Sequence, residues 1–224
     1  MSGWSPNVNL NSAVKVVDGA AQAKVYKGLA IASQGGAPFL YATDFHNGVV
    51  DVFDSNFAKV GSVGAFTDAT LPAGYAPFGI QAIGNLVYVS FAKQDGQAQD
   101  EVKGVGLGAV DVFDASGTLV KRLIPAGGKL NAAWGMALAP ADFGRFSSAL
   151  LVGNFGDGTI NAFDPATGAF LGTLSRSDGA PIAIDGLWGI AFGNGINAQP
   201  TNTLFYAAGP AGETPGVYGR IDNR

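Results

Sequence analysis

Three ten-residue stretches of the chain are near copies of one another, and this repetition constrains the fold more than any other feature. They are GVVDVFDSNF at 48–57, GAVDVFDASG at 108–117 and GTINAFDPAT at 158–167. The repeated segment ends in Asp54, Asp114 and Asp164, and a weaker fourth copy ends at Asp222, at intervals of 60, 50 and 58 residues. Internal repeats of about 40 to 50 residues are typical of β-propeller blades. We therefore expect a set of similar β-sheet units.

A second marker recurs in phase with the first: a bulky residue and a glycine open an apolar run. The glycines are Gly28, Gly79, Gly135 and Gly189, at intervals of 51, 56 and 54 residues. Between the two markers lies a third β-like run, at 39–45, 86–92, 149–155 and 204–208. A fourth run follows the aspartate in the first three units, as AKVGSV, LVKRLI and AFLGTL. Four short strands joined by Gly, Asn, Asp and Pro turns describe one propeller blade.

The chain is thus predicted to be one all-β domain, 1–224, a β-propeller of four-stranded blades with about four blades. The predicted blades are 26–66, 77–127, 133–178, and 187–224 together with 12–18. In this arrangement residues 12–18 supply the fourth strand of the C-terminal blade and close the ring. The alternative is an open arc, whose unpaired terminal edge strands would favour a homodimer.

The repeated stretch is the predicted third strand of each blade together with its turn. Alternation in VDVFD places Val50 and Val52 on one face and Asp51 and Phe53 on the other, and neighbouring blades cover both faces. The terminal Asp54 is expected to accept backbone N–H bonds in the turn that follows. The Trp-Gly pairs at 134–135 and 188–189 are expected to pack inner strands close to a crowded axis.

Composition agrees with a β-rich, turn-rich protein and excludes several partners. Charged residues make up only 13% of the chain, and 34 of 224 residues are glycine. A net charge of −4 without a Lys/Arg cluster argues against nucleic acid. No apolar run is long enough to span a membrane, and the N-terminus lacks the pattern of a signal peptide. The absence of cysteine removes disulfides, thiolate nucleophiles and Cys metal sites.

Several longer segments carry a resemblance to a known family. They include FLYATDFHNGVVDVFDSNF, TLPAGYAPFGIQ, NAAWGMALAPADFGRFSSALLVGNFGDGTINAFDPATGAFLG and AIDGLWGIAFGNG. The chain resembles uncharacterised bacterial β-propellers related to NHL-repeat proteins, found in species with the PEP-CTERM sorting system. The resemblance implies a propeller fold and a longer exported parent, extracellular or periplasmic, with a signal peptide and about two further repeats absent from this chain. It implies no established activity.

Candidate site residues gather in the loops between second and third strands, which share one face of a propeller with the connections into first strands. His46, the only histidine, lies beside Asp44, and this pair could serve acid–base chemistry. One histidine without cysteine cannot form a typical zinc site. The loop that starts at Lys93 carries Asp95, Asp100 and Glu101, whose oxygens could hold Ca²⁺, although no spaced calcium motif is present. Apart from this possible Ca²⁺ the sequence predicts no cofactor, and it does not identify a set of metal ligands.

Two functions remain open at the sequence level. The first is a non-catalytic exported binding or scaffold propeller that presents its loop face to a small molecule, glycan, peptide or matrix ligand. The second is a lyase or hydrolase of NHL type, with His46 as base, Asp44 orienting it and a bound divalent cation. The candidate ligand-binding residues are Lys93, Asp95, Asn154, Asp157, Asp185, Trp134 and Trp188. An enzyme predicts that His46 and at least two carboxylates share one polar pocket, whereas a scaffold predicts that they are scattered.

Overall fold

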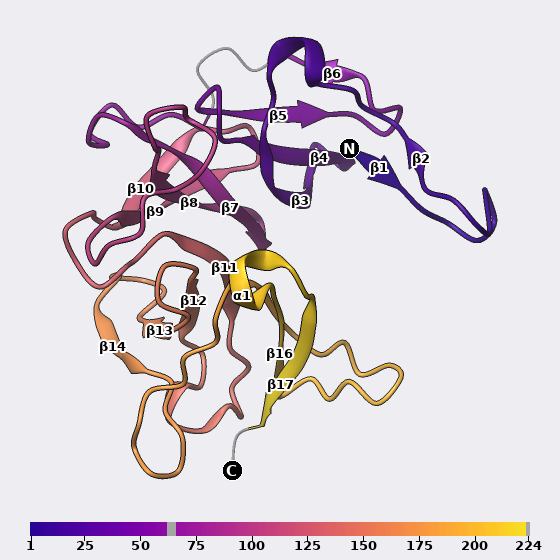
Figure 1. Ribbon diagram of the computed structural model, residues 1–224. Helices are drawn as coiled ribbons and strands as arrows, with labels where there is room; N and C mark the ends of the chain where they lie inside the picture. The colour runs from indigo at the N-terminus through magenta and orange to yellow at the C-terminus, as the bar shows by residue number, and fades with distance from the viewer. Residues whose placement is uncertain (62–65, 223–224) are drawn as a thin grey trace.

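The computed structural model describes residues 1–61 and 66–222 and contains four antiparallel sheets arranged around a common centre (Figure 1). Blade 1 comprises β3 (Tyr26–Gln34), β4 (Ala37–Asp44), β5 (Val49–Phe53) and β6 (Lys59–Val60). Blade 2 comprises β7 (Tyr75–Ile83), β8 (Leu86–Lys93), β9 (Gly108–Asp114) and β10 (Leu119–Ile124). Blade 3 comprises β11 (Ala133–Leu138), β12 (Leu150–Asn154), β13 (Ile160–Phe163) and β14 (Phe170–Thr173). Blade 4 comprises β15 (Leu187–Phe192), β16 (Thr203–Ala208) and β17 (Val217–Asp222). The predicted all-β propeller of about four blades is confirmed.

Apolar residues of successive blades fill three layers of core. One layer lies between blades 1 and 2 and includes Tyr41, Val50, Val52 and Phe113. The second lies between blades 2 and 3, and the third between blades 3 and 4. Because Val50 and Val52 face blade 2 while Asp51 faces the other way, the predicted alternation is confirmed. Strands β8 and β12 have a neighbouring blade on both faces and are buried along nearly their whole length, which explains their near-continuous apolar runs in the sequence.

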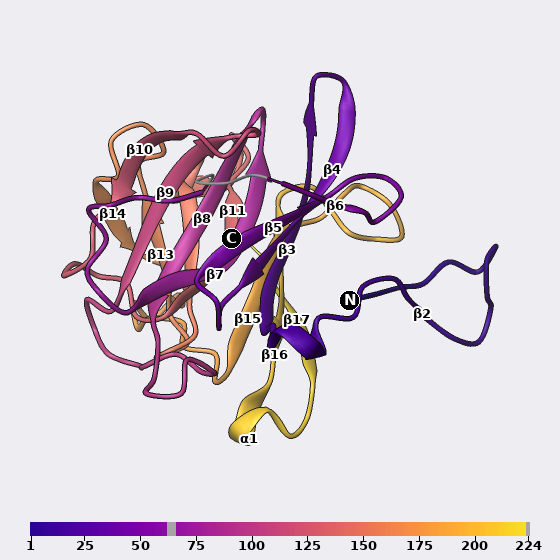
Figure 2. The same cartoon turned by 90° about the horizontal axis from the view of Figure 1, so that it is seen from above.

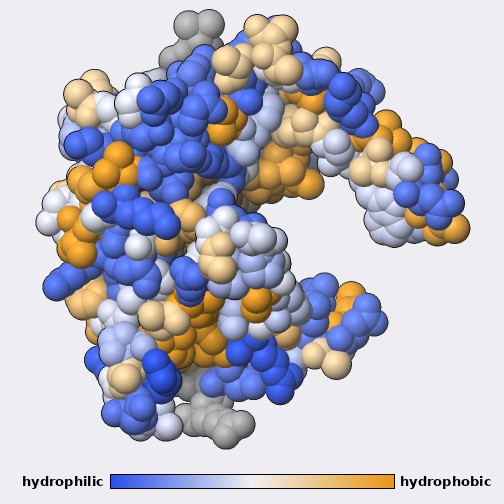
Figure 3. All heavy atoms as spheres, viewed as in Figure 1, coloured by the Kyte–Doolittle hydropathy of each residue, from blue (hydrophilic) through white to orange (hydrophobic). Residues whose placement is uncertain are grey.

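The predicted closure of the ring is wrong. Strand β2 (Val14–Lys15) pairs with β1 (Ser2–Gly3), and the blade 4 sheet has the order β15-β16-β17. Residues 1–18, the N-terminal arm, project away from the blades in both ribbon views (Figures 1 and 2). A notch therefore opens between the arm and blade 1 on one side and blade 4 on the other (Figure 3). Several arm side chains are exposed, including those of Trp4, Val8, Leu10 and Val14. Strand β2 has only a few residues that can form ladder hydrogen bonds. The alternation pattern in the sequence therefore does not determine which strand it pairs with.

The turn aspartates act as the repeat predicts. The carboxylate of Asp54 accepts bonds from the backbone amides of Asn56 and Ala58, both at 2.9 Å. Asp114 and Asp164 cap the equivalent turns of blades 2 and 3 through backbone amides. Part of the predicted fourth strand of blade 1, and the connection after it, fall on residues 62–65, and the end of the last predicted blade falls on 223–224; these lie outside the described residues.

Glycines let the innermost strands approach one another closely, as predicted. A Cβ on Gly135 would lie 2.7 Å from both the carbonyl oxygen of Trp188 and the amide nitrogen of Ile190 in the next blade. A Cβ on Gly79 would collide with the carbonyl oxygen of Trp134 and lie 2.8 Å from Ser90 Oγ. Successive first strands can therefore pack with backbone against backbone.

One polar position in the third strand of each of blades 1 to 3 is buried, which the alternation pattern alone does not explain. Asp51 in blade 1 binds Lys24 Nζ and Lys59 Nζ, both at 2.6 Å. Asp111 in blade 2 pairs with Arg122 of the outer strand. Each buried acid is thus neutralised by a cation on the outermost strand of its own blade, Lys59 on β6 or Arg122 on β10. The equivalent residue of blade 3 is Asn161, which accepts a hydrogen bond from Thr173 Oγ1 at 2.8 Å.

Candidate ligand-binding site at the channel mouth

The four innermost strands surround a cavity of about 380 Å³, here called the channel. Each first strand begins at the same end of the channel, where the connections between second and third strands also lie. The residue before the repeated glycine stands at this mouth in every blade: Lys27, Phe78, Trp134 and Trp188. Lys27, Trp134 and Trp188 line the cavity itself. The repeat therefore places one cation and two aromatic rings around one opening, while Phe78 is fully buried and packs against Trp134.

The two tryptophans differ in how firmly they are held. Trp134 Nε1 donates to the carbonyl oxygen of Lys27 at 2.9 Å, and its ring centroid lies 4.5 Å from that of Phe78 and 5.4 Å from that of Phe155. Trp188 Nε1 donates to Glu213 Oε1 at 2.5 Å in the short helix α1 (Pro210–Glu213). Both indoles are half-buried, and their polar nitrogens are satisfied. Trp134 is thus fixed by ring packing on both sides, as expected for packing, whereas Trp188 depends on a loop residue.

The charges at the mouth are paired within the protein. Lys27 Nζ lies 2.9 Å from Asp100 Oδ1 and 3.8 Å from Glu101 Oε2. The Glu101 side chain is only 6% exposed, and burial raises its pKa above the usual range despite the nearby Lys27. Lys103 Nζ lies 4.2 Å from the centroid of the Phe155 ring. The long loop between β8 and β9 therefore folds over the mouth and supplies the partners of Lys27.

The structure does not form the predicted His46–Asp44 pair. His46 Nδ1 lies 3.2 Å from the carbonyl oxygen of Ala98 and 3.2 Å from Gln99 Nε2. The carboxylate of Asp44 is fully buried and is bound instead by Lys24 Nζ at 2.9 Å and Asn47 Nδ2 at 2.7 Å. Asp44 therefore closes its own loop and ties it to the segment before β3. Sequence proximity misled because the two side chains leave the turn in different directions.

The remaining predicted residues mostly hold loops together. The backbone amides of Gln97 and Gln99 donate to Asp95 Oδ1, and these hydrogen bonds lower the pKa of Asp95. Lys93 is exposed. Asn154 Oδ1 accepts from the amide of Asn131. Asp157 accepts from Asn131 Nδ2, and Asp185 accepts from the amide of Ala211.

The carboxylates also fail to converge on a cation. Among residues 1–61 and 66–222, no group of three or more His, Asp or Glu side chains could hold a metal ion. The predicted calcium ligands separate, because Asp95 binds backbone amides of its own loop while Asp100 binds Lys27. In the part of the chain that the structure describes, no helix is long and apolar enough to cross a membrane.

Lys27 is a residue of the mouth that the sequence analysis does not name as a candidate, and Glu101 is predicted there only as a possible calcium ligand. Lys27 carries a readable signal, because it occupies the position where the other three blades have Phe78, Trp134 and Trp188. A cation at a repeat position that is aromatic in the other blades indicates a role other than packing the core. The burial of Glu101 has no such signal in the sequence, since it depends on how the fourteen residues between β8 and β9 fold, and loop conformation is set by tertiary contacts.

Comparisons with known proteins find related sequences and solved structures of the same fold. No family model matches the chain. Uncharacterized protein R648 of Acanthamoeba polyphaga mimivirus is 34% identical over 201 residues, which cover 88% of this chain and 48% of that protein. Uncharacterized protein L690 of the same virus is 38% identical over 177 residues, 76% of this chain and 45% of that protein. The chain thus spans about half the length of the curated relatives that it matches.

Two solved structures share the architecture at low sequence identity. An α-L-arabinanase of Penicillium chrysogenum complexed with arabinobiose is 9% identical, with a TM-score of 0.57, over 89% of this chain and 58% of that one. An exo-β-1,3-galactanase of Phanerochaete chrysosporium, with β-1,3-galactotriose, is 12% identical, with a TM-score of 0.56, over 86% and 46%. The chain is a β-propeller. At these identities the likeness shows the fold alone.

Proposed function

We propose that the protein is a non-catalytic binding propeller, acting outside the cytoplasm, that holds a neutral glycan at the mouth of its channel. The observation that carries the proposal is the grouping of Lys27, Trp134 and Trp188 around one opening. Sugar rings present flat apolar faces and many hydroxyls, so aromatic surfaces with a few fixed polar groups suit them. A cavity of about 380 Å³ lies within the size range of small-molecule sites.

The charges at the mouth favour a neutral ligand over an ionic one. Lys27 is compensated by Asp100 and Glu101, so an anionic ligand would have to displace a carboxylate that is already bound. Compensated charges can still exchange hydrogen bonds with hydroxyl groups. The pairing therefore supports recognition by stacking and hydrogen bonds.

The hydrolase or lyase alternative has less support in the geometry. A general base needs a partner that orients it, and the imidazole of His46 contacts an amide and a carbonyl oxygen. Glycoside hydrolysis generally uses two carboxyl groups on either side of the scissile bond. Glu101, with its raised pKa, would suit the acid, but its neighbour Asp100 is paired with Lys27.

Binding to an array of neutral oligosaccharides that includes arabinobiose and β-1,3-galactotriose tests the proposal, followed by calorimetry on the best ligand. Trp188→Ala is expected to weaken binding by about tenfold or more, since buried aromatic anchors contribute most at binding sites. Trp4→Ala, in the arm, is the matched control and should bind as the unmodified protein does. No binding to any neutral glycan, or equal binding by Trp188→Ala, would refute the site. Release of shortened oligosaccharides, lost in Glu101→Gln, would establish the enzyme instead.

A further inference from the structure

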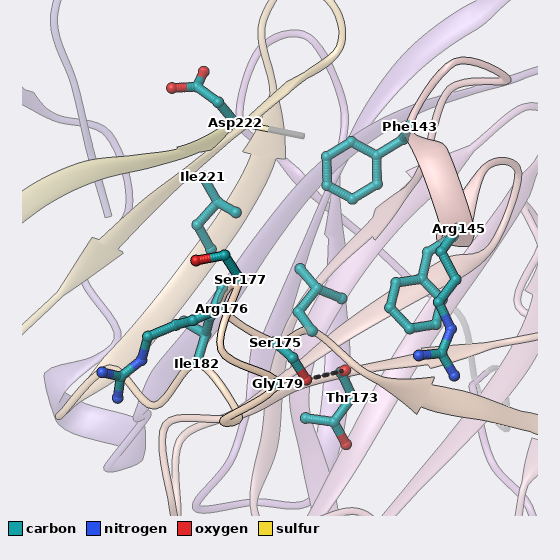
Figure 4. A pocket seen from close by; sticks show the side chains of 12 residues that line it. Phe143, Arg145, Thr173, Ser175, Arg176, Ser177, Gly179, Ile182, Ile221 and Asp222 are labelled. Atoms are coloured by element: carbon teal, nitrogen blue, oxygen red, sulfur yellow. Dashed lines mark hydrogen bonds between the residues drawn. The ribbon is translucent and has the colours of Figure 1, made fainter. Parts of the chain in front are cut away.

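A second cavity, separate from the channel, lies on the outer side of blades 3 and 4. Its volume is about 560 Å³, and it shares no lining residue with the channel. The apolar part is formed by Phe143, Leu174, Ile182 and Ile221, and the rest includes Thr173, Ser175 and Ser177 (Figure 4). Arg145 and Arg176 stand at opposite sides of this groove in the same view. The groove is therefore apolar in its middle and cationic at its sides.

The groove runs beside an unpaired strand edge. In blades 1 to 3 a fourth strand pairs with the third, as β10 does with β9. In blade 4 the third strand, β17, pairs only with β16 within the described residues. Ile221 and Asp222 of this edge strand line the groove. The backbone donors and acceptors of β17 are thus open to an additional strand next to an apolar surface.

The charges around this edge differ from those of the complete blades. In blades 1 and 2 the third strand supplies a buried acid, Asp51 or Asp111, and the outer strand supplies the cation. In blade 4 the equivalent third-strand residue is Gly219, which has no side chain to charge.

The unpaired cations beside this edge, Arg145 and Arg176, come from blade 3 and its connection to blade 4. The side chains of Arg145 and Arg176 form no ion pair within residues 1–61 and 66–222; Arg145 lies over the ring of Phe146. The one carboxylate in the lining, Asp222, is held by Thr203 Oγ1 at 2.9 Å and Arg220 Nε at 3.2 Å. The arrangement of charges is thus the reverse of that in blades 1 and 2. At the β17 edge the protein supplies the cations, so a strand that completes blade 4 must supply the carboxylates.

We propose that an extended peptide with carboxylate side chains docks in this groove as the fourth strand of blade 4. Its backbone pairs with β17, alternate apolar side chains cover Leu174 and Ile221, and its carboxylates bind the guanidinium groups of Arg145 and Arg176. Strand addition of this kind takes affinity from the backbone and selectivity from the side chains, and arginine binds carboxylates through two parallel hydrogen bonds. The chain's own arm is a poorer occupant, because β2 carries Lys15 and one acid, Asp18, to which that lysine is paired at 2.6 Å.

The test measures charge preference with defined probes on the full chain. Fluorescein-labelled peptides TVEVEVT and TVKVKVT are titrated at 50 mM and 150 mM salt, and binding is followed by anisotropy. We expect the acidic peptide to bind at least tenfold more tightly. Binding should slow hydrogen exchange of the amides of Val217–Asp222. An acidic peptide that binds no better than the basic one, or that leaves these amides unprotected, overturns the proposal.

Charge-reversed variants separate this groove from nonspecific attraction. The double variant Arg145→Glu with Arg176→Glu should prefer the basic peptide TVKVKVT. The control Lys93→Glu changes the charge of an exposed residue near the channel mouth and should keep the preference for the acidic peptide. The neutral pair Arg145→Ala and Arg176→Ala serves if the reversed variant unfolds, and should abolish the preference. Sedimentation of the full chain tests whether a second copy of the chain occupies the groove. A dimer that dissociates in the arginine variants would show that a second copy fills the groove, and the proposal of a separate acidic peptide would then be wrong.

Discussion

Replacement of the buried Asp51 by asparagine should destabilise blade 1 strongly. The carboxylate is 1% exposed and binds Lys24 Nζ, Lys59 Nζ and the hydroxyl of Tyr26, the last at 2.7 Å. Burial by itself raises the pKa of Asp51, but hydrogen bonds from Lys24, Lys59 and Tyr26 outweigh it, so the pKa lies below its usual range. The ionised form is therefore the stable one at neutral pH, and Asp51→Asn removes the charge that its partners require.

The expected loss of unfolding free energy depends on how exposed each cationic partner of Asp51 is. Lys24 is nearly buried and keeps only Asp44, whereas Lys59 is 54% exposed and returns to water at little cost. Breaking a buried pair on one side costs about 3–5 kcal/mol, and because Asp44 still compensates Lys24 we expect about 3 kcal/mol. Asn161 fills the same position of blade 3, so the amide itself fits the slot and the loss reports charge.

Urea unfolding followed by circular dichroism checks this value at pH 7. Asp18→Asn, which breaks an exposed pair with Lys15, is the control and should leave the stability nearly unchanged. An Asp51→Asn variant within about 0.5 kcal/mol of the unmodified protein would refute the reasoning, because the buried charge would then contribute nothing.

Two further predictions concern stability. Burial raises the pKa of Asp111 to about 6, above the unfolded value of about 3.9, so its contribution is largest below pH 4 and is lost as pH rises through 6. The free energy of unfolding of the unmodified protein minus that of Asp111→Asn should therefore fall by on the order of 2 kcal/mol from pH 4 to pH 7 in denaturant titrations; a value that rises over this range would contradict the reasoning. Gly79→Ala should cost about 1–3 kcal/mol or more, because the added Cβ meets the backbone of Trp134, whereas Gly189→Ala, with nothing within 4 Å, should be nearly neutral in thermal unfolding.

The repeated features of the fold could be predicted from sequence, and the features that occur once could not. Asp54 and its equivalents recur, so their turns and the strands before them were predicted correctly. The course of residues 12–18 rests on two ladder pairs, and no periodicity distinguishes pairing with β1 from pairing with β17. The relation to NHL-type bacterial propellers stays a prediction.

The candidate site follows the same division. Trp134 and Trp188 were placed at the channel because they mark a repeat position. The pairing of Lys27 with Asp100, and the separation of His46 from Asp44, depend on the path of single loops. Loop paths follow from tertiary contacts that local sequence does not encode.

The bond from Trp134 Nε1 to the carbonyl oxygen of Lys27 joins blade 3 to blade 1 without passing through blade 2. In an arc where each blade packs on the next, unfolding can begin at an end and proceed one blade at a time. This cross-channel bond makes release of the first blade depend on the third. Under a force applied to the N-terminus, the first three blades should therefore yield as one cooperative event and blade 4 as a separate, weaker one.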